Sequence, residues 1–258
     1  MAAEAPPGRR AAPLDRLVVA HLFMTRLPLG GGRPVDERRL ARAVVAFPLV
    51  GVTVGGAAAL TRLAAEPLGP AFACVLALAV APMLTGALHE DGLADTFDAL
   101  GPHGRGRRLE AMRDPRLGTF GVLALVLSLA ARLALLVPLA PGDAAAALVA
   151  AHVLGRWSAL PLAARAPRIR ADGAAAWLPR PGSVELAAAS ALALAASAPL
   201  LVLVGPAALL ALPVAAAVTG ACGLAWQRAF GGVSGDVCGA TNQLVELSVY
   251  LAVAAAVA

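Results

Sequence analysis

Repeated long apolar segments limit what this chain can fold into. Seven of them, each near the roughly 20 residues that a helix needs to cross a bilayer, cover residues 43–63, 71–88, 119–139, 144–163, 184–204, 206–226 and 243–257. Backbone groups in lipid must be hydrogen-bonded within the protein, so such segments predict α-helices. We therefore expect an all-α, polytopic transmembrane bundle with about seven spans. Whether 144–163 crosses fully is open, because it contains His152 and Arg156.

The chain before these segments has a different character. Residues 1–13 have the composition of a disordered tail, and apolar residues then recur at helical spacing up to residue 29 with charges between them. This pattern predicts an interfacial helix that lies on the membrane. We therefore divide the chain into a cytoplasmic tail with an interfacial helix, residues 1–42, and a transmembrane catalytic bundle, residues 43–258. No second soluble domain or internal repeat is visible.

The arginines are distributed unevenly along the chain. All 21 basic residues are Arg; eight precede the first apolar segment, and five, four and one lie in residues 89–118, 164–183 and 227–242. The intervening short connections carry none, apart from Arg62 at the end of an apolar segment. The positive-inside rule places the N-terminus and these three loops in the cytoplasm. We expect a multi-pass cell-membrane protein, and no nucleic-acid partner, because no aromatic-rich basic face accompanies the charge.

An acidic stretch interrupts the apolar pattern after residue 88. Asp91, Asp95 and Asp98 are spaced so that one helix face would carry all three carboxylates, and Glu110 and Asp114 repeat the four-residue spacing. Clustered oxygen ligands suit a hard cation such as Mg²⁺. The alternative is a solvated acidic face at the end of a membrane helix. Five arginines follow, and metal with arginine is a combination that binds phosphate, so phosphoryl transfer is the first chemical expectation.

Two ionisable residues lie inside apolar segments. Arg132 and Arg156 would be costly there without partners, which makes each a functional hypothesis. Arg132 could pair with Glu246 or another buried acid. Arg156 could instead extend its guanidinium to the membrane surface.

Several motifs together resemble a known family, the cobalamin synthases or adenosylcobinamide-GDP ribazoletransferases. The most specific is His-Glu-Asp-Gly-Leu-Ala-Asp-Thr at 89–96, followed by Met-Arg-Asp-Pro-Arg-Leu-Gly-Thr at 112–119. Shorter pieces of the resemblance lie at 25–28, 47–51, 231–236 and 239–240. The acidic run is also distantly similar to that of CDP-alcohol phosphotransferases.

The resemblance implies an activity and its partners. The enzyme would join adenosylcobinamide-GDP to α-ribazole or its 5′-phosphate, release GMP and require Mg²⁺. A homo-oligomer is possible. The ribose hydroxyl of α-ribazole would attack the phosphorus next to the cobinamide arm, with Asp98 as the acceptor of its proton. Arg113 and Arg116 would offset the charge that develops on GMP.

The resemblance also implies roles for particular residues. The metal ligands would be Asp91, Asp95, Asp98 and Asp114. The catalytic residues would be Asp98, Asp95, Arg113 and Arg116. The substrate-binding residues would be Arg156, Gly235, Asp236 and His89, with Asp236 a further possible ligand of the ion. Glu246 matches an acidic position of the family.

Two other functions remain open from the sequence. A CDP-alcohol-type phospholipid synthase would share the metal chemistry, but the motif of that superfamily has Arg after Ala94, where this chain has Asp95. A membrane transporter could use Arg132 and Arg156 to line a path. It would be expected to expose polar groups at both faces, whereas the polar motifs here cluster on one.

Overall fold

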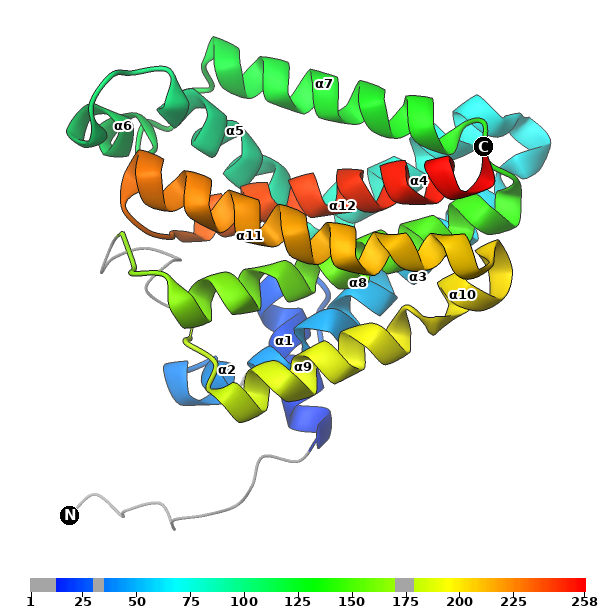
Figure 1. The fold of residues 1–258 in the computed structure, drawn as a ribbon, viewed down its shortest axis with the longest axis horizontal. Helices are drawn as coiled ribbons and strands as arrows, with labels where there is room; N and C mark the ends of the chain where they lie inside the picture. Colours follow the sequence, from blue (N-terminus) through cyan, green and yellow to red (C-terminus); the bar gives the residue numbers. More distant parts are fainter. Residues whose placement is uncertain (1–12, 30–34, 170–178) are drawn as a thin grey trace.

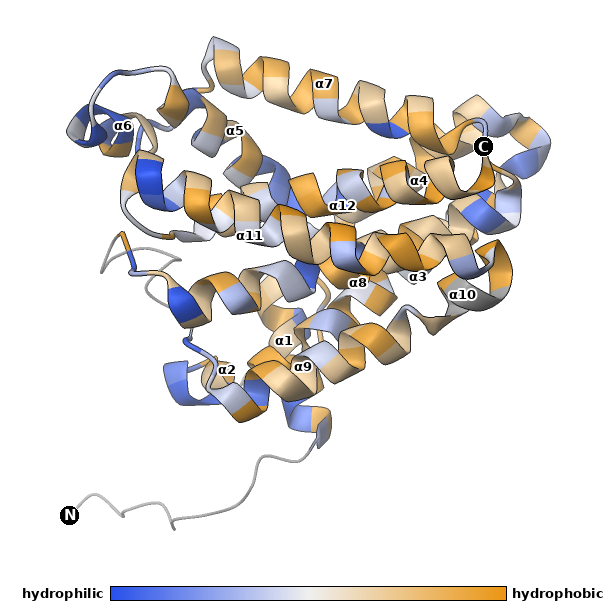
Figure 2. Cartoon of the chain, viewed as in Figure 1, coloured by the Kyte–Doolittle hydropathy of each residue, from blue (hydrophilic) through white to orange (hydrophobic). Residues whose placement is uncertain are grey.

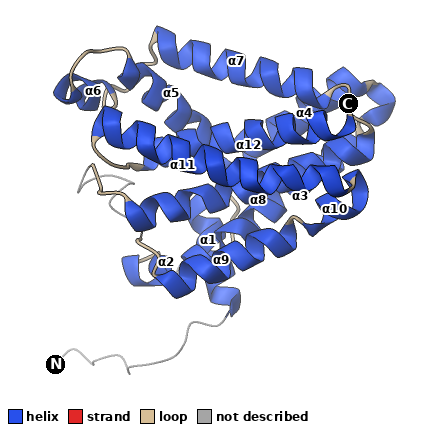
Figure 3. Cartoon of the chain, in the orientation of Figure 1, coloured by secondary structure: helices blue, strands red, loops and turns tan. Residues whose placement is uncertain are grey.

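The computed structural model describes residues 13–29, 35–169 and 179–258, and within these ranges the regular structure is helical (Figure 3). The helices are α1 (Pro13–Met24), α2 (Glu37–Ala43), η1 (Val44–Ala46), α3 (Phe47–Ala64), η2 (Glu66–Leu68), α4 (Pro70–Thr85), α5 (Leu88–Leu100), α6 (Arg105–Ala111), α7 (Thr119–Leu136), α8 (Pro141–Arg165), α9 (Ser183–Ala196), α10 (Ala198–Val204), η4 (Pro206–Leu210), α11 (Ala211–Phe230) and α12 (Gly235–Val257). The predicted all-α bundle is confirmed. Of the predicted tail, residues 1–13, residues 1–12 lie outside the described ranges and Pro13 begins α1.

Five helical stretches in the described ranges are long and apolar enough to cross a membrane, or six if α4 and α5 form one bent span. The segment expected at 144–163 lies within the continuous helix α8, which is long and apolar enough to cross a membrane despite His152 and Arg156. It is the central helix, because 83% of its apolar window is buried, against 17% for α7 on the outside of the bundle (Figure 1).

Small residues allow α3 to lie directly against α8. A Cβ atom added at Gly55 would be only 2.8 Å from the carbonyl oxygen of Leu148, and one at Gly51 would collide with the backbone at His152. Close backbone approach of this kind is typical of membrane helices, where association depends on packing rather than on a hydrophobic effect. The α3–α8 pair therefore forms the centre of the bundle.

The expected span 71–88 ends in a sharp bend. Gly86 and Ala87 both have left-handed backbone conformations, with φ of 69° and 59°, and α5 leaves α4 at 90°. A non-glycine residue in this region costs roughly 1–2 kcal/mol, so the surrounding packing must hold Ala87 there. The bend directs the acidic stretch, which forms the helix that its spacing predicts, against α7 and α12.

The expected span 184–204 is divided into two helices, each shorter than a full span. Helix α9 ends at Ala196, and the Ser197 hydroxyl and N–H both donate to the carbonyl oxygen of Ala193, at 2.9 and 3.1 Å. Pro199 follows and has no N–H to continue the helical hydrogen bonding. This division, together with the bent α4–α5 pair, accounts for the difference from seven straight spans.

Helix α1 packs into the bundle. His21 Nε2 lies 2.8 Å from the Thr53 hydroxyl of α3, and the Phe23 and Phe47 rings stack with centroids 5.9 Å apart. In Figure 1 the helix runs across the direction of the long helices. The most hydrophilic segments, including α6 and the ends of α8 and α11 that lead into polar loops, gather at one end of the bundle (Figure 2).

Candidate active site

A cavity of about 160 Å³ lies where α5, α8 and α12 meet, beside the end of α1. It brings together five residues that the sequence singled out: His89, Asp91, Arg156, Gly235 and Asp236. These residues come from three helices that are far apart in the sequence. The cavity is therefore the place where the predicted substrate-binding residues and part of the predicted metal site coincide.

The crossing of α5 and α12 creates this arrangement. A Cβ atom added at Gly92 would lie 2.6 Å from the carbonyl oxygen of Asp236, and one at Gly239 would lie 3.3 Å from the Cα of Gly92. The separation at Gly92 requires glycine, and the one at Gly239 is tighter than an ordinary Cβ contact. The neighbouring side chains of Asp91 and Asp236 consequently line the same cavity.

The start of α12 is fixed by contacts with two other segments. Val233 N–H donates to the Pro167 carbonyl at 2.8 Å and Ile169 N–H donates back to Val233 at 2.9 Å, forming a short β-bridge to the segment after α8. Ser234 caps the helix by accepting from Val237 N–H at 3.4 Å, and its hydroxyl also lies 3.7 Å from the Met112 sulfur. The N-terminus of α12 thus opens onto the cavity, where the helix dipole favours an anion.

A buried ionic cluster holds Arg156 in the cavity wall. The fully buried Glu246 carboxylate accepts from Arg132 Nη1 at 2.8 Å, pairs with Arg156 and lies 2.8 Å from His152 Nδ1. Arg132 also donates to the Gln243 side chain at 2.7 Å. The expected Arg132–Glu246 pair is confirmed, and Arg156 is buried rather than extended to the surface. Each buried charge therefore has an opposite charge in contact, as membrane interiors require.

Three buried polar atoms at the cavity lack a hydrogen-bond partner within the described residues: His89 Nδ1, Asn242 Oδ1 and Arg156 Nε. Unsatisfied buried polar atoms are costly and rare in native structures, and at a cavity they indicate where a ligand or water binds. Our reading of the sequence missed Asn242. The signal was present, because Gly235, Gly239, Asn242 and Glu246 recur at helical spacing along α12.

The other predicted acids are already engaged by the protein. Asp98 accepts from the N–H groups of Gly118 and Gly121 at 2.7 and 2.8 Å, which fixes the start of α7 to α5. Asp114 lies on the exposed loop before α7 and pairs with Arg116 at 2.6 Å. Hydrogen bonds from Arg116 lower the pKa of the Asp114 carboxyl to about 2.

Two further predicted residues lie near these acids. Asp95 is partly buried on α5, one turn beyond Asp91, and Arg113 lies in the same loop as Asp114. Within the described ranges, no three His, Cys, Asp or Glu residues are grouped so that they could hold an ion by themselves. The two carboxylates at the cavity, Asp91 and Asp236, fit Mg²⁺ in a different way, because that ion is commonly held by one or two carboxylates together with substrate phosphates and water.

Comparison with known proteins identifies the family. The family model described as cobalamin-5-phosphate synthase matches residues 16–254. An adenosylcobinamide-GDP ribazoletransferase from Bradyrhizobium diazoefficiens is 41% identical over 93% of each chain. The enzyme of the same name from Azorhizobium caulinodans is 42% identical over 90% of this chain and 92% of its own. That from Chlorobaculum tepidum is 36% identical over 92% and 94%. No solved structure matches the chain. The chain belongs to the cobalamin-5-phosphate synthase family.

Proposed function

We propose that this protein is an adenosylcobinamide-GDP ribazoletransferase. It joins adenosylcobinamide-GDP to α-ribazole or its 5′-phosphate, yields adenosylcobalamin or its phosphate, and releases GMP. Family membership and the names of the relatives support the reaction. The structural observation that carries it is the meeting of Asp91, Asp236 and Arg156 at one cavity beside the N-terminus of α12. Together these groups suit a nucleotide diphosphate better than a neutral solute.

We propose Mg²⁺ as the cofactor. Asp91 and Asp236 would hold the ion, and oxygens of the substrate diphosphate would supply further ligands. The ion would neutralise charge on the diphosphate as the phosphorus–oxygen bond to GMP breaks. Asp98 and Asp114 were also expected as ligands, but both oxygens of each already accept hydrogen bonds, from Gly118, Gly121 and Arg116. Asp236 Oδ2 accepts from the Ser234 hydroxyl at 3.2 Å, a longer bond that the ion would replace. The exposed helix end with Asp91 therefore carries the metal-binding role in this proposal.

The residues of the chain itself bind and orient the substrates. Arg156, fixed by Glu246, provides a cation at the diphosphate. The first turn of α12 at Gly235 would face the same anion. His89 Nδ1 and Asn242 Oδ1, which have no hydrogen-bond partner among the described residues, are placed to hydrogen-bond a polar group of the bound substrate. These fixed groups need little rearrangement during the reaction, which is how preorganised sites lower a barrier.

The attacking ribose hydroxyl of α-ribazole forms a bond to the phosphorus next to the cobinamide arm. GMP leaves, and the hydroxyl proton passes to a carboxylate. Because Asp98 is engaged by two backbone N–H groups, we give it the task of holding α7 in place and assign the proton to a different carboxylate. Arg113 and Arg116, from the loop before α7, would approach the departing GMP, with Arg116 leaving its pair with Asp114.

We also propose that the polar end of the bundle faces the cytoplasm. Helix α6 and the start of α7 lie toward this end (Figures 1 and 2), as does the start of α12, which lines the cavity. The loops that carry most of the arginines outside the N-terminal region connect there, in agreement with the positive-inside rule.

Release of GMP tests the function directly. Purified protein in lipid nanodiscs is incubated with adenosylcobinamide-GDP and Mg²⁺, with and without α-ribazole. GMP should appear only when α-ribazole is present, together with the corrinoid product. Release of CMP from CDP-diacylglycerol with an alcohol acceptor would instead identify a phospholipid synthase. Absence of any nucleotide release, with substrate movement across liposomes, would identify a transporter.

A further inference from the structure

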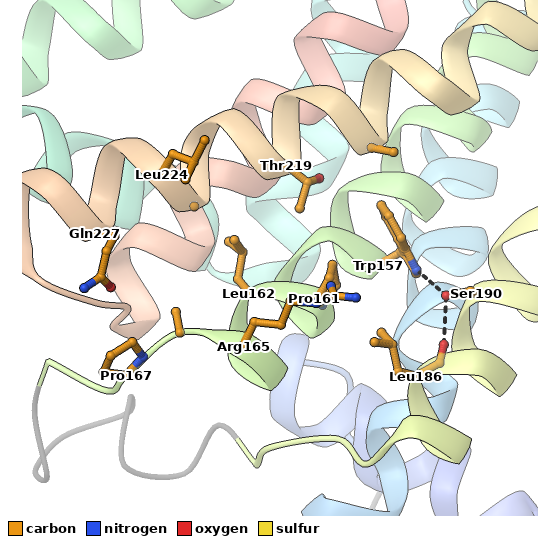
Figure 4. Close-up of a pocket in the computed structure, with 14 residues that line it drawn as sticks. Trp157, Pro161, Leu162, Arg165, Pro167, Leu186, Ser190, Thr219, Leu224 and Gln227 are labelled. Atoms are coloured by element: carbon orange, nitrogen blue, oxygen red, sulfur yellow. Dashed lines mark hydrogen bonds between the residues drawn. The ribbon is translucent and has the colours of Figure 1, made fainter.

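A second, larger cavity lies on the side of the bundle, away from the candidate active site. Its volume is about 630 Å³, within the roughly 300–1,000 Å³ of small-molecule sites. Its walls are α8 and α11, both long enough to span the membrane, and the apolar helix α9. We call this cavity the lateral groove. Figure 4 shows its lining, with Trp157 and Ser190 toward one end and Pro167 and Gln227 toward the other.

The polar side chains at the Trp157 end of the lateral groove and on α11 use their hydrogen-bond donors within the protein. Trp157 Nε1 donates to Ser190 Oγ at 2.9 Å, and that hydroxyl donates to the Leu186 carbonyl at 2.8 Å. The Thr219 hydroxyl donates to its own helix, to the carbonyl of Ala215, at 2.7 Å. Because these groups are already satisfied, this part of the wall favours a hydrocarbon over a polar ligand.

The groove has open space where α11 carries glycine. A Cβ atom added at Gly220 would meet no atom within 4 Å, whereas one at Gly223 would approach the Leu162 side chain to 2.9 Å. Eleven residues separate Ala216 from Gln227, which line the groove along α11, about 16 Å of helix at about 1.5 Å per residue. This is close to half of the roughly 30 Å hydrocarbon thickness of a bilayer. The groove therefore matches the depth of one leaflet.

Polar groups return where α8 and α11 run into the polar loops. Arg165, the last residue of α8, is exposed and lines the groove, and Gln227 lines it from the last turn of α11. Within the described residues, Arg165 forms no ion pair. An exposed cation beside an apolar channel of one-leaflet depth complements an anionic headgroup joined to a hydrocarbon chain.

We propose that the lateral groove binds one anionic phospholipid of the leaflet next to the polar loops. One acyl chain lies along α11 over Gly220, and the phosphate is bound by Arg165 and Gln227. The lipid acts as a structural ligand that fills the space between α8, α9 and α11. This site is separate from the cavity at Asp91 and takes no part in the proposed transfer reaction.

Native mass spectrometry and thermal unfolding of the full chain test this proposal. Dioleoyl phosphatidylglycerol and dioleoyl phosphatidylcholine are titrated into protein in mild detergent. One phosphatidylglycerol should remain bound, and it should raise the unfolding midpoint more than phosphatidylcholine does. Gly220→Leu should remove both effects by filling the groove. Gly56→Leu, the same change on α3 where an added Cβ also meets nothing within 4 Å, should keep both.

A second pair of variants tests the headgroup contact without changing the apolar wall. Arg165→Gln should weaken phosphatidylglycerol binding about fivefold, the effect of losing one cation near an anionic lipid. Arg228→Gln, an exposed arginine at the same end of α11 that does not line the groove, should leave binding unchanged. Equal lipid retention by Gly220→Leu and the unmodified protein would overturn the proposal. So would loss of a dimer in Gly220→Leu, or displacement of the lipid by α-ribazole phosphate, because the groove would then serve another occupant.

Discussion

The two ends of α5 carry acids on the same helical stripe but use them differently. At the first turn, Asp91 lines the cavity beside His89, whose Nδ1 has no partner within the described residues. At the last turn, both oxygens of Asp98 accept backbone N–H groups from the start of α7. Seven residues, about 10 Å of helix, separate a carboxylate that faces a ligand site from one that holds two helices together. Spacing shows that acids share a face, but only packing shows which of them a ligand can reach.

The largest effect should follow from Asp91→Asn. A metal ion contributes several kcal/mol of charge stabilisation in transfer reactions, so losing a ligand carboxylate should lower kcat by about 10²- to 10³-fold. GMP release, measured over a range of Mg²⁺ concentrations, should need more Mg²⁺ to reach its reduced maximum. An unchanged unfolding midpoint would show that the bundle is intact. Full activity of the purified Asp91→Asn variant would show that Asp91 is not a metal ligand.

Glu246→Gln tests the support behind Arg156. Without the carboxylate, Arg132 and Arg156 remain buried without their opposite charge, a change that costs about 3–5 kcal/mol in buried pairs. We expect a lower unfolding midpoint and about a tenfold increase in KM for adenosylcobinamide-GDP. Glu246→Asp, which keeps the charge, should recover part of both. If Glu246→Gln lowers the unfolding midpoint but leaves KM for adenosylcobinamide-GDP unchanged, the role of the cluster is purely structural.

Asp98→Asn should mainly affect stability, and it sharpens the contrast within α5. The amide can still accept one N–H, but its NH₂ group faces the other, so the unfolding free energy should fall by about 1–3 kcal/mol. Turnover per folded molecule should change by no more than a few-fold. The opposite result, a large loss of kcat with an unchanged midpoint, would make Asp98 the proton acceptor and give both ends of α5 a chemical role.

The smallest effect should come from Asp114→Asn. The pKa of Asp114 is lowered from 3.8 to about 2, so the pair with Arg116 stabilises the fold above about pH 4 and is lost as the pH falls toward 2. Because both side chains are exposed, solvent screens the pair. Unfolding midpoints of the variant and the unmodified protein should converge as the pH falls through 3 and coincide below about pH 2. They should differ by little at pH 7, where GMP release should be unchanged. A large loss of turnover at pH 7 would bring Asp114 back into the metal site.

Much of the architecture could be predicted because it depends on local pattern. Apolar length predicted the helices, four-residue spacing placed the acids on one helix, and two opposite charges inside apolar segments predicted the Arg132–Glu246 pair. The bend at Ala87 had no such signal, since alanine is among the best helix formers and its left-handed conformation depends on surrounding packing.

Parts of the site depend on how helices are rotated against each other. His152 contacts Glu246 because α8 packs against α12. Asn242 and His89 line one cavity because α12 also packs against α5. No spacing within one segment contains that information. The glycines Gly92 and Gly239 mark the crossing of α5 and α12, but one glycine cannot be assigned to the other without the structure.

The short β-bridge after α8 has a mechanical consequence. Pro167 lines the lateral groove, and its carbonyl accepts the N–H of Val233, two residues before α12 begins at Gly235. A displacement of the end of α8 is therefore transmitted to the turn that presents Asp236. An occupant of the lateral groove would therefore contact the same segment that positions the turn before α12.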